Sequence, residues 1–223
     1  PQPEPVHPHL LRFTENTRPI LQDSRGDFWF GSWNEGVAKY DGEHLTYFTT
    51  EDGLPDNQVR RILEDPEGRV WFETGRGLSY SDGREIFPVI DRDYLARDDW
   101  RLVPGALWFK GDEPTGYNES EGDLGVYRLD NDTPTFLTLP LPKDRELRAQ
   151  HSVTHIATGP TGRLWVSTYA AIVGFDGESF TVLDNESLGL TEATGFLHAR
   201  CVFEDSRGRV WIGNNGIGVL LYE

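Results

Sequence analysis

Arginines recur at one position of a repeated pattern, and they are the first residues of this sequence that could do chemistry. Arg18, Arg60 and Arg200 each stand five residues before the Asp of an Asp-x-x-Gly turn, and Thr154 holds the same place before Gly159. Several guanidinium groups around one mouth would bind carboxylate, sulfate or phosphate, because Arg presents a fork of donors. The alternative is that each arginine pairs with an acidic neighbour, since repeats preserve structural bridges as readily as sites.

A second set of residues could carry acid–base chemistry. Glu73 and Lys110 stand two residues after a repeated tryptophan, where the other copies have Gly or Ser. They could form an ion pair, or act as a general base and its electrostatic partner. His151, His155 and His198 add imidazoles that could bind a metal or transfer protons, but their spacing matches no compact metal motif. We therefore assign no catalytic residue, no metal site and no cofactor.

A repeat with a period of about 45 residues must position these side chains. In each copy a β-branched run leads into a turn, a Trp-containing strand follows, and an Asp-Gly hairpin often joins two further strands. Four strands at this period indicate a propeller blade. The marker tryptophans of the copies are Trp29, Trp71, Trp108, Trp165 and Trp211.

The sequence thus predicts an all-β fold, a five-bladed β-propeller of four-stranded antiparallel blades. The last copy lacks a fourth strand, and residues 9–14 resemble residues 44–49, the fourth strand of the first copy. We expect this N-terminal strand to complete the last blade and close the ring. The expected organisation is a Pro-rich tether (1–8) and a single propeller domain (9–223), with blades at about 17–49, 59–89, 99–140, 153–183 and 198–223 plus 9–14.

The repeats resemble the two-component regulator propeller family. The family's order of turn, tryptophan, hairpin and Asp-Gly-Leu-Pro tail is matched at Asp23–Gly31, Gly36-Val37, Tyr40-Asp41-Gly42 and Asp52–Pro55. The third copy departs most, because it has lost the Asp and shortened the turn. The resemblance implies a bacterial ligand-binding sensor outside the cytoplasm, whether periplasmic, secreted or lipid-tethered, with its export signal already removed.

In propellers of this kind the ligand meets the loops that enter the innermost strands and those that join second to third strands. A long insertion at 111–124 falls on this face; its carboxylates could bind Ca²⁺, but their spacing favours a solvated acidic loop. The candidate ligand-binding residues on the loop face are Arg18, Trp33, Glu35, Arg60, Glu73, Arg76, Lys110, Tyr117, Asn118, Tyr169, Arg200 and Asn214.

Composition excludes several partners. The 223 residues carry a net charge of −16, which opposes binding to nucleic acid or to an anionic membrane surface. No segment approaches the roughly 20 apolar residues that a membrane span needs. The single Cys201 cannot form an internal disulfide, and we expect it to be buried in an inner strand. We expect a monomer.

Two functions remain open from the sequence. The favoured one is a sensor-type binding module that recognises a small molecule, a glycan or a protein on its loop face near the central channel, without chemistry. The alternative is a lyase or hydrolase at the channel mouth, metal-dependent or not, which would use Glu73, Lys110, His155 and His198. The absence of any known catalytic motif favours binding.

Overall fold

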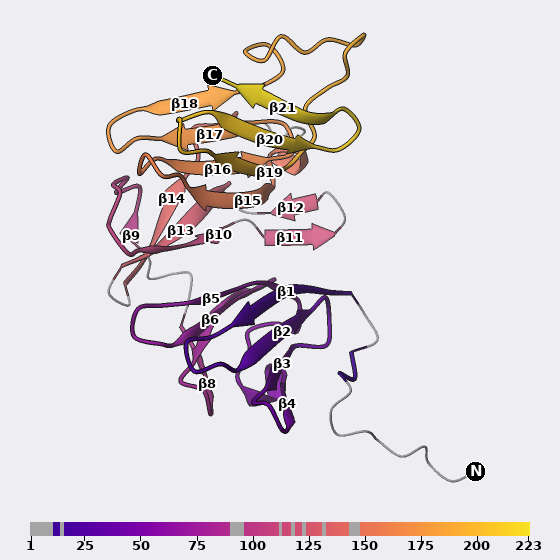
Figure 1. Ribbon diagram of the computed structural model, residues 1–223, viewed down its shortest axis with the longest axis vertical. Helices are drawn as coiled ribbons and strands as arrows, with labels where there is room; N and C mark the ends of the chain where they lie inside the picture. The colour runs from indigo at the N-terminus through magenta and orange to yellow at the C-terminus, as the bar shows by residue number, and fades with distance from the viewer. Residues whose placement is uncertain are drawn as a thin grey trace, which may run out of the picture. The chain divides into compact units, whose positions relative to one another are not determined.

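The computed structural model describes residues 11–13, 16–89, 96–111, 113–116, 119–121, 124–130, 133–142 and 148–223. The chain divides into two compact units, Pro1–Tyr94 and Leu95–Glu223. Within the described residues the fold is all-β, with strands gathered into small sheets and only short 3₁₀ turns between them (Figure 1).

The first unit holds two four-stranded sheets in which every neighbouring pair is antiparallel and strand order follows chain order. These sheets match the first two predicted blades closely. Their strands are β1 (Thr17–Gln22), β2 (Phe28–Ser32), β3 (Val37–Tyr40) and β4 (Leu45–Phe48), then β5 (Val59–Glu64), β6 (Val70–Thr74), β7 (Gly77–Ser81) and β8 (Ile86–Pro88).

The second unit holds three larger sheets and one small hairpin (Figure 1). The first sheet has the order β10-β13-β14-β9, from β9 (Ala96–Arg97), β10 (Leu107–Lys110), β13 (Gly125–Asp130) and β14 (Thr133–Thr138). The other two follow chain order, β15 (Val153–Thr158), β16 (Leu164–Thr168), β17 (Ile172–Phe175) and β18 (Phe180–Leu183), then β19 (Ala199–Glu204), β20 (Val210–Asn214) and β21 (Gly218–Tyr222).

The Asp-x-x-Gly turn is held by its own aspartate, which also fixes the marker tryptophan. Asp65 accepts hydrogen bonds from the backbone N–H of Glu67 (3.1 Å) and Arg69 (2.8 Å), and from Trp71 Nε1 (2.7 Å). The same bond joins Asp23 to Trp29 and Asp205 to Trp211. One carboxylate therefore satisfies both the turn and a buried indole, which explains why the two residue types recur at a fixed spacing.

The sheet beginning at β15 breaks this rule, with a visible consequence. Gly159 replaces the aspartate, and the indole nitrogen of the fully buried Trp165 has no hydrogen-bond partner among the described residues. A Cβ at position 159 would overlap the carboxylate of Glu204, which accepts from the Thr161 hydroxyl at 2.7 and 2.9 Å. Glycine stands here because Glu204 of the next sheet fills the space that a side chain would need.

Apolar side chains fill the space between successive sheets within each unit. In the first unit Trp29 packs on Phe72, with ring centroids 5.4 Å apart, and Val70 and Ile62 complete that core. In the second unit the buried Trp165 faces Ile212, Val202 and Val210 of the following sheet. Trp29, Trp71, Trp108 and Trp165 are buried and Trp211 is half-buried, as expected for side chains that pack between sheets.

The sheet that carries Trp108 differs from the predicted blade. We expected residues 99–140 to form a blade of four antiparallel strands. Instead β10, the Trp strand, lies at one edge, and β9 pairs parallel with β14 at the other. No strand forms over residues 98–106, where a turn closes with a hydrogen bond from Ala106 N to Val103 O; Pro104, which has no N–H, interrupts the run that would form an inner strand.

Three smaller expectations also change. The insertion at 111–124 contains a hairpin, β11 (Glu113–Gly116) and β12 (Glu119–Glu121), where a loop was expected. Cys201 is exposed, not buried. Half of the predicted strand at 9–14 lies outside the described residues; Leu11–Phe13 form no strand, and Arg12 N donates to the Tyr47 hydroxyl of β4 at 2.9 Å.

Candidate functional site

A β-bulge opens the first strand of four sheets. The register shifts after Thr17 in β1, after Val59 in β5, after Val153 in β15 and after Ala199 in β19. The residue that follows each of these positions is the one that the sequence aligned, so Arg18, Arg60, Thr154 and Arg200 share one structural place. At a bulge the side chain of the extra residue no longer follows the regular alternation between the two faces of the strand. Each of these residues, at the end of its sheet, therefore has a side-chain direction that differs from that of a regular strand.

In the second unit the bulge arginine meets an aromatic loop residue. The guanidinium carbon of Arg200 lies 4.9 Å from the centroid of the Tyr169 ring, and Nη1 donates to the Tyr169 hydroxyl at 3.3 Å. Arg200 is exposed and Tyr169 is half-buried. The ring therefore fixes the orientation of the cation while most of its donors stay available to a ligand.

His198 packs on the ring of Tyr169, the same ring that Arg200 contacts. Its ring centroid lies 4.8 Å from that of Tyr169. Burial lowers the pKa of His198, and the positive charge of Arg200 lowers that pKa further. The imidazole is thus neutral at pH 7, and its buried Nε2 has no hydrogen-bond partner among the described residues. We call Tyr169, His198 and Arg200 the Tyr–His–Arg cluster.

Asn214 supports this cluster from behind. Its side-chain oxygen accepts from His198 N, and its Nδ2 donates to Phe196 O (3.4 Å) and Asn215 O (3.3 Å). The side chain is 9% exposed. Two of these bonds go to the backbone of the loop that carries His198 and the third goes to the neighbouring Asn215, so Asn214 positions that loop.

The first unit repeats the aromatic arrangement once. Arg18 lies over the Trp33 ring with its guanidinium carbon 5.1 Å from the centroid, and Trp33 is 44% exposed. Trp33 belongs to the loop between β2 and β3, where Ser32 Oγ accepts from the backbone N–H of the half-buried Glu35 at 3.2 Å. A second cation on an aromatic ring therefore stands at the end of another sheet.

Arg60 has a different partner and a different role. Its Nε lies 3.7 Å from Glu73 Oε1, and Glu73 is 1% exposed. Arg61 faces Glu73 across β5 and β6; burial lowers the pKa of Arg61, and the Glu73 charge opposes that change. A buried carboxylate shared by two arginines compensates one of their two positive charges and holds both side chains in place, so the structural bridge is the better description at this bulge.

The remaining predicted residues are placed separately. Arg76 is exposed and lies 3.6 Å from Asp56 Oδ2 through its Nε. Lys110 is half-buried at the end of β10 in the second unit, whereas Glu73 belongs to the first, so the predicted Glu73–Lys110 ion pair stays a prediction. Tyr117 and Asn118 lie outside the described residues.

Sequence reasoning missed two residues that contact the predicted site residues. Arg61 shares Glu73 with Arg60, and its position directly after Arg60 could have suggested this. His198 was considered only as a metal ligand or proton donor, and no sequence signal announced its contact with Tyr169. In the described parts of the chain, no three His, Cys, Asp or Glu side chains gather into a set that could hold a metal ion.

Comparison with known proteins identifies the repeats. Residues 53–74 and 196–216 match the two component regulator propeller family. No curated protein matches the chain in sequence. Of the residues that the structure describes, none form a helix with the length and apolar character needed to cross a membrane.

Solved structures share the fold at low sequence identity. The extracellular domain assigned to the hybrid two-component system BT4673 of B. thetaiotaomicron is 16% identical with a TM-score of 0.65, over 100% of this chain and 28% of that one. The corresponding domain of BT3049 is 18% identical with a TM-score of 0.60, over 93% and 27%. This chain thus spans little more than a quarter of those domains.

An enzyme shares the fold as well. A catalytically inactive variant of virginiamycin B lyase from Staphylococcus aureus, solved with quinupristin, is 14% identical with a TM-score of 0.61, over 96% of this chain and 72% of that one. At such identities these likenesses describe the fold and not the chemistry. The two matched segments lie in the second and fifth of the larger sheets, so two of the five copies match the two component regulator propeller family.

Proposed function

We propose that this chain is the ligand-recognition part of a sensor-type β-propeller and that it binds a small molecule or glycan bearing an anionic group. The observation that carries the proposal is the exposed Arg200 guanidinium fixed over the Tyr169 ring at 4.9 Å. The binding residues are those of the Tyr–His–Arg cluster, with Arg18 and Trp33 as a similar arrangement in the first unit.

The chemistry of the cluster favours an anion next to a flat or apolar group. A stacked guanidinium loses little further side-chain entropy on binding, and it offers parallel N–H donors to a carboxylate or sulfate. The neutral His198 adds a nitrogen without adding charge. Arg60 supplies the contrast, because its side chain already pairs with the buried Glu73. We therefore assign ligand contact to Arg200 and Arg18, and structural pairing to Arg60.

The test is thermal melting of the protein against uronic acids, acidic oligosaccharides, organic acids and neutral sugars. A ligand at about one hundred times its Kd should add about 2.7 kcal/mol to the free energy of unfolding. Arg200→Ala should weaken binding about tenfold or more, since a charge-assisted hydrogen bond is lost. Arg207→Ala is the matched control, because Arg207 is exposed in the turn at the opposite end of β19. Equal loss in both variants would contradict the proposal.

A lyase is the second candidate, and one observation favours it. The lowered pKa of His198 and its contact with Tyr169 give a neutral imidazole beside a phenol, a pair that could abstract and return a proton. Quinupristin, present in the structure of the similar lyase variant, is the first probe. Mass spectrometry would follow the amount of quinupristin during incubation with the protein. Loss of quinupristin with the wild type, and no loss with His198→Gln, would favour catalysis over binding alone.

We further propose that the five larger sheets are blades of one closed ring in a monomeric domain, completed by residues 9–14. The supporting observation in the last sheet is that β21 has one neighbour, β20, and that its Val219 and Leu221 are 65% and 44% exposed. In the first sheet Ile20 is 61% exposed, whereas the corresponding Ile62 of the second sheet is 6% exposed. Such faces need partners, and blade packing would supply them.

The proposed location is outside the cytoplasm, in the periplasm, at the cell surface or in the medium. Support comes from the similarity of the fold to extracellular domains of two-component systems. Cell fractionation of the natural host with an antibody against the chain tests it, and recovery in the cytoplasmic fraction would contradict it.

A further inference from the structure

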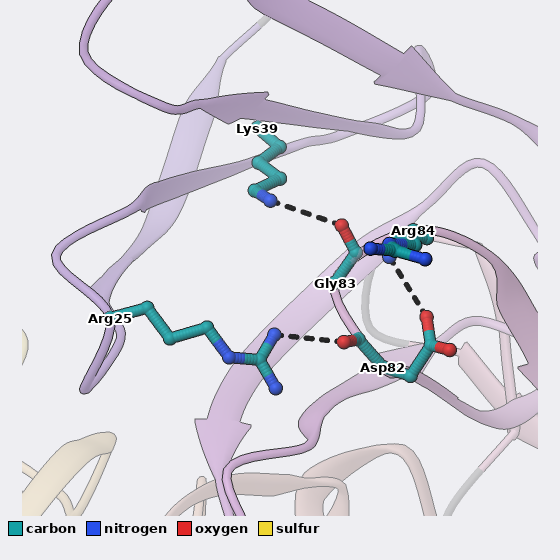
Figure 2. A pocket seen from close by; sticks show the side chains of 5 residues that line it. All are labelled: Arg25, Lys39, Asp82, Gly83 and Arg84. Carbon is teal, nitrogen blue, oxygen red and sulfur yellow. Dashed lines mark hydrogen bonds between the residues drawn. The ribbon is translucent and has the colours of Figure 1, made fainter.

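We propose a second anion-binding site, in the first unit, at the end of the sheets opposite the bulges. A pocket of about 460 Å³ lies there, lined by Arg25, Lys39, Asp82, Gly83 and Arg84 (Figure 2). Its cationic side chains come from the turn between β1 and β2, from β3, and from the turn between β7 and β8. The inference goes beyond the proposed function, because none of these residues belongs to the loop face.

Arg25 and Lys39 are held in the pocket by neutral acceptors. Arg25 donates from Nη1 to Asp82 O at 2.8 Å and from Nη2 to Gly68 O at 3.1 Å, and Lys39 Nζ donates to Gly83 O at 3.0 Å. Figure 2 shows both side chains reaching the same turn from the neighbouring sheet. The backbone carbonyls orient both cations, and they leave the positive charge of Arg25 available to a ligand, whereas Lys39 also pairs with the Asp27 carboxylate.

The side chains that line the pocket carry more positive than negative charges. Lys39 Nζ also pairs with Asp27 Oδ2 at 2.6 Å. The Asp82 carboxylate accepts from the backbone N–H of Arg84 (2.8 Å) and Glu85 (3.1 Å), and these bonds lower the pKa of Asp82. The lining itself thus holds three cationic side chains and one carboxylate, while Asp27 and Asp41 interact with Lys39 from beside the pocket. In a protein of net charge −16, a locally positive pocket runs against the overall field.

Glycine at position 83 makes the arrangement possible. Gly83 has a φ of +100°, and a Cβ there would overlap Arg25 Nη1. Only glycine allows both this backbone conformation and the close approach of the guanidinium. The backbone of the turn at Gly83 therefore forms this part of the pocket, and no side chain at position 83 takes part.

The lining selects the class of ligand. No apolar side chain lines the pocket, so it suits a compact, strongly hydrated group and not an aromatic or aliphatic one. Guanidinium and ammonium donors that converge from two sheets match the several acceptor oxygens of a tetrahedral oxyanion. The ligand class is therefore phosphate or sulfate, free or as an ester group on a larger molecule. The exposed Arg84 would close the site over it.

The test is isothermal titration of the intact chain with inorganic phosphate, inorganic sulfate and methyl phosphate at constant ionic strength. We expect saturable binding of one anion, and weakening of about tenfold in Arg84→Gln, whose side chain holds no other sheet in place. Arg207→Gln, an equal change of charge far from these turns in sequence, should bind as the wild type does. Preference for methyl phosphate would indicate an ester ligand, and preference for an inorganic anion a free one.

Three results would overturn the site. They are absence of saturation in the wild type, unchanged affinity in Arg84→Gln, and equal weakening in Arg207→Gln. Backbone amide shifts on titration give an independent measure, since they should concentrate at residues 24–26 and 82–85. Arg200→Ala separates this site from the proposed function, because it should weaken ligand binding at the Tyr–His–Arg cluster and leave phosphate binding unchanged.

Discussion

Replacing Asp65 with alanine tests whether one aspartate stabilises both the turn and the buried indole of Trp71. The Asp65 carboxylate is 7% exposed and accepts from Trp71 Nε1 at 2.7 Å, from Arg69 Nε at 2.6 Å and from two backbone N–H groups. Its removal leaves the indole N–H of a fully buried Trp71 without an acceptor. One unsatisfied buried donor costs about 1–3 kcal/mol, and the lost charge-assisted bonds of the turn add to this, so we expect a total of about 3 kcal/mol.

A double-mutant cycle isolates the bond between carboxylate and indole. Trp71→Phe removes the donor, and the combination of Asp65→Ala with Trp71→Phe should cost less than the two single changes together. The expected coupling is about 1.5 kcal/mol or more, measured by urea unfolding followed by far-ultraviolet circular dichroism. A coupling below about 0.5 kcal/mol would refute the reasoning, because well-separated, independent changes add within that margin.

The sheet beginning at β15 supplies a natural control. Trp165 Nε1 has no hydrogen-bond partner among the described residues, since Gly159 stands where the aspartate would be. Trp165→Phe therefore removes packing but breaks no bond to an aspartate. We expect it to cost less than Trp71→Phe by about 1 kcal/mol or more. Equal costs would mean that the indole bond contributes nothing net to stability.

Three further outcomes are expected. The backbone N–H groups of Ser179 and Glu178 and the Ser179 hydroxyl lower the pKa of Asp176 to about 2. The stabilising effect of the Asp176 carboxylate is therefore present above about pH 4 and is lost as the pH falls towards 2. Asp176→Asn should make the free energy of unfolding, measured by urea titration, depend less on pH in this range. Gly159→Ala should lower the free energy of unfolding by about 1–3 kcal/mol through overlap with Glu204, and Glu204→Ala in the same chain should recover part of the loss, whereas additive losses would argue against the overlap. Deletion of residues 6–14 should lower the melting temperature strongly and promote aggregation if they close the ring; an unchanged melting curve contradicts closure, and Tyr47→Ala controls for the contact with Arg12.

Local patterns in the sequence were enough for most of the strands. The turn, the marker tryptophan and the Asp-Gly hairpin are separated by a few residues, so β1–β8 and β15–β21 lie close to their predicted positions. The equivalence of Arg18, Arg60, Thr154 and Arg200 was also predictable, because each stands at a fixed distance before its turn. Interactions that depend on neighbours within one repeat leave a periodic trace.

Contacts between distant segments leave no such trace. The parallel pairing of β9 with β14 joins residues about 40 positions apart in sequence, and neither segment carries a signal for the other. Each bulge arginine contacts the residue that the facing loop or strand places beside it. These residues are Trp33 for Arg18, Glu73 for Arg60 and Tyr169 for Arg200. The pocket around Gly83 combines turns of two sheets, and only the three-dimensional arrangement brings its cations together.

The central claim is that a ligand binds at the bulge ends of the sheets through the Tyr–His–Arg cluster. Hydrogen–deuterium exchange with and without a saturating oligosaccharide of uronic acids tests it most directly, because it reports where protection falls. The account predicts slower exchange at residues 169–171, 198–201 and 214–216, with no change at the turns 24–26 and 205–209, and loss of this protection in Arg200→Ala. Protection confined to the opposite turns, or protection that survives Arg200→Ala undiminished, would contradict it.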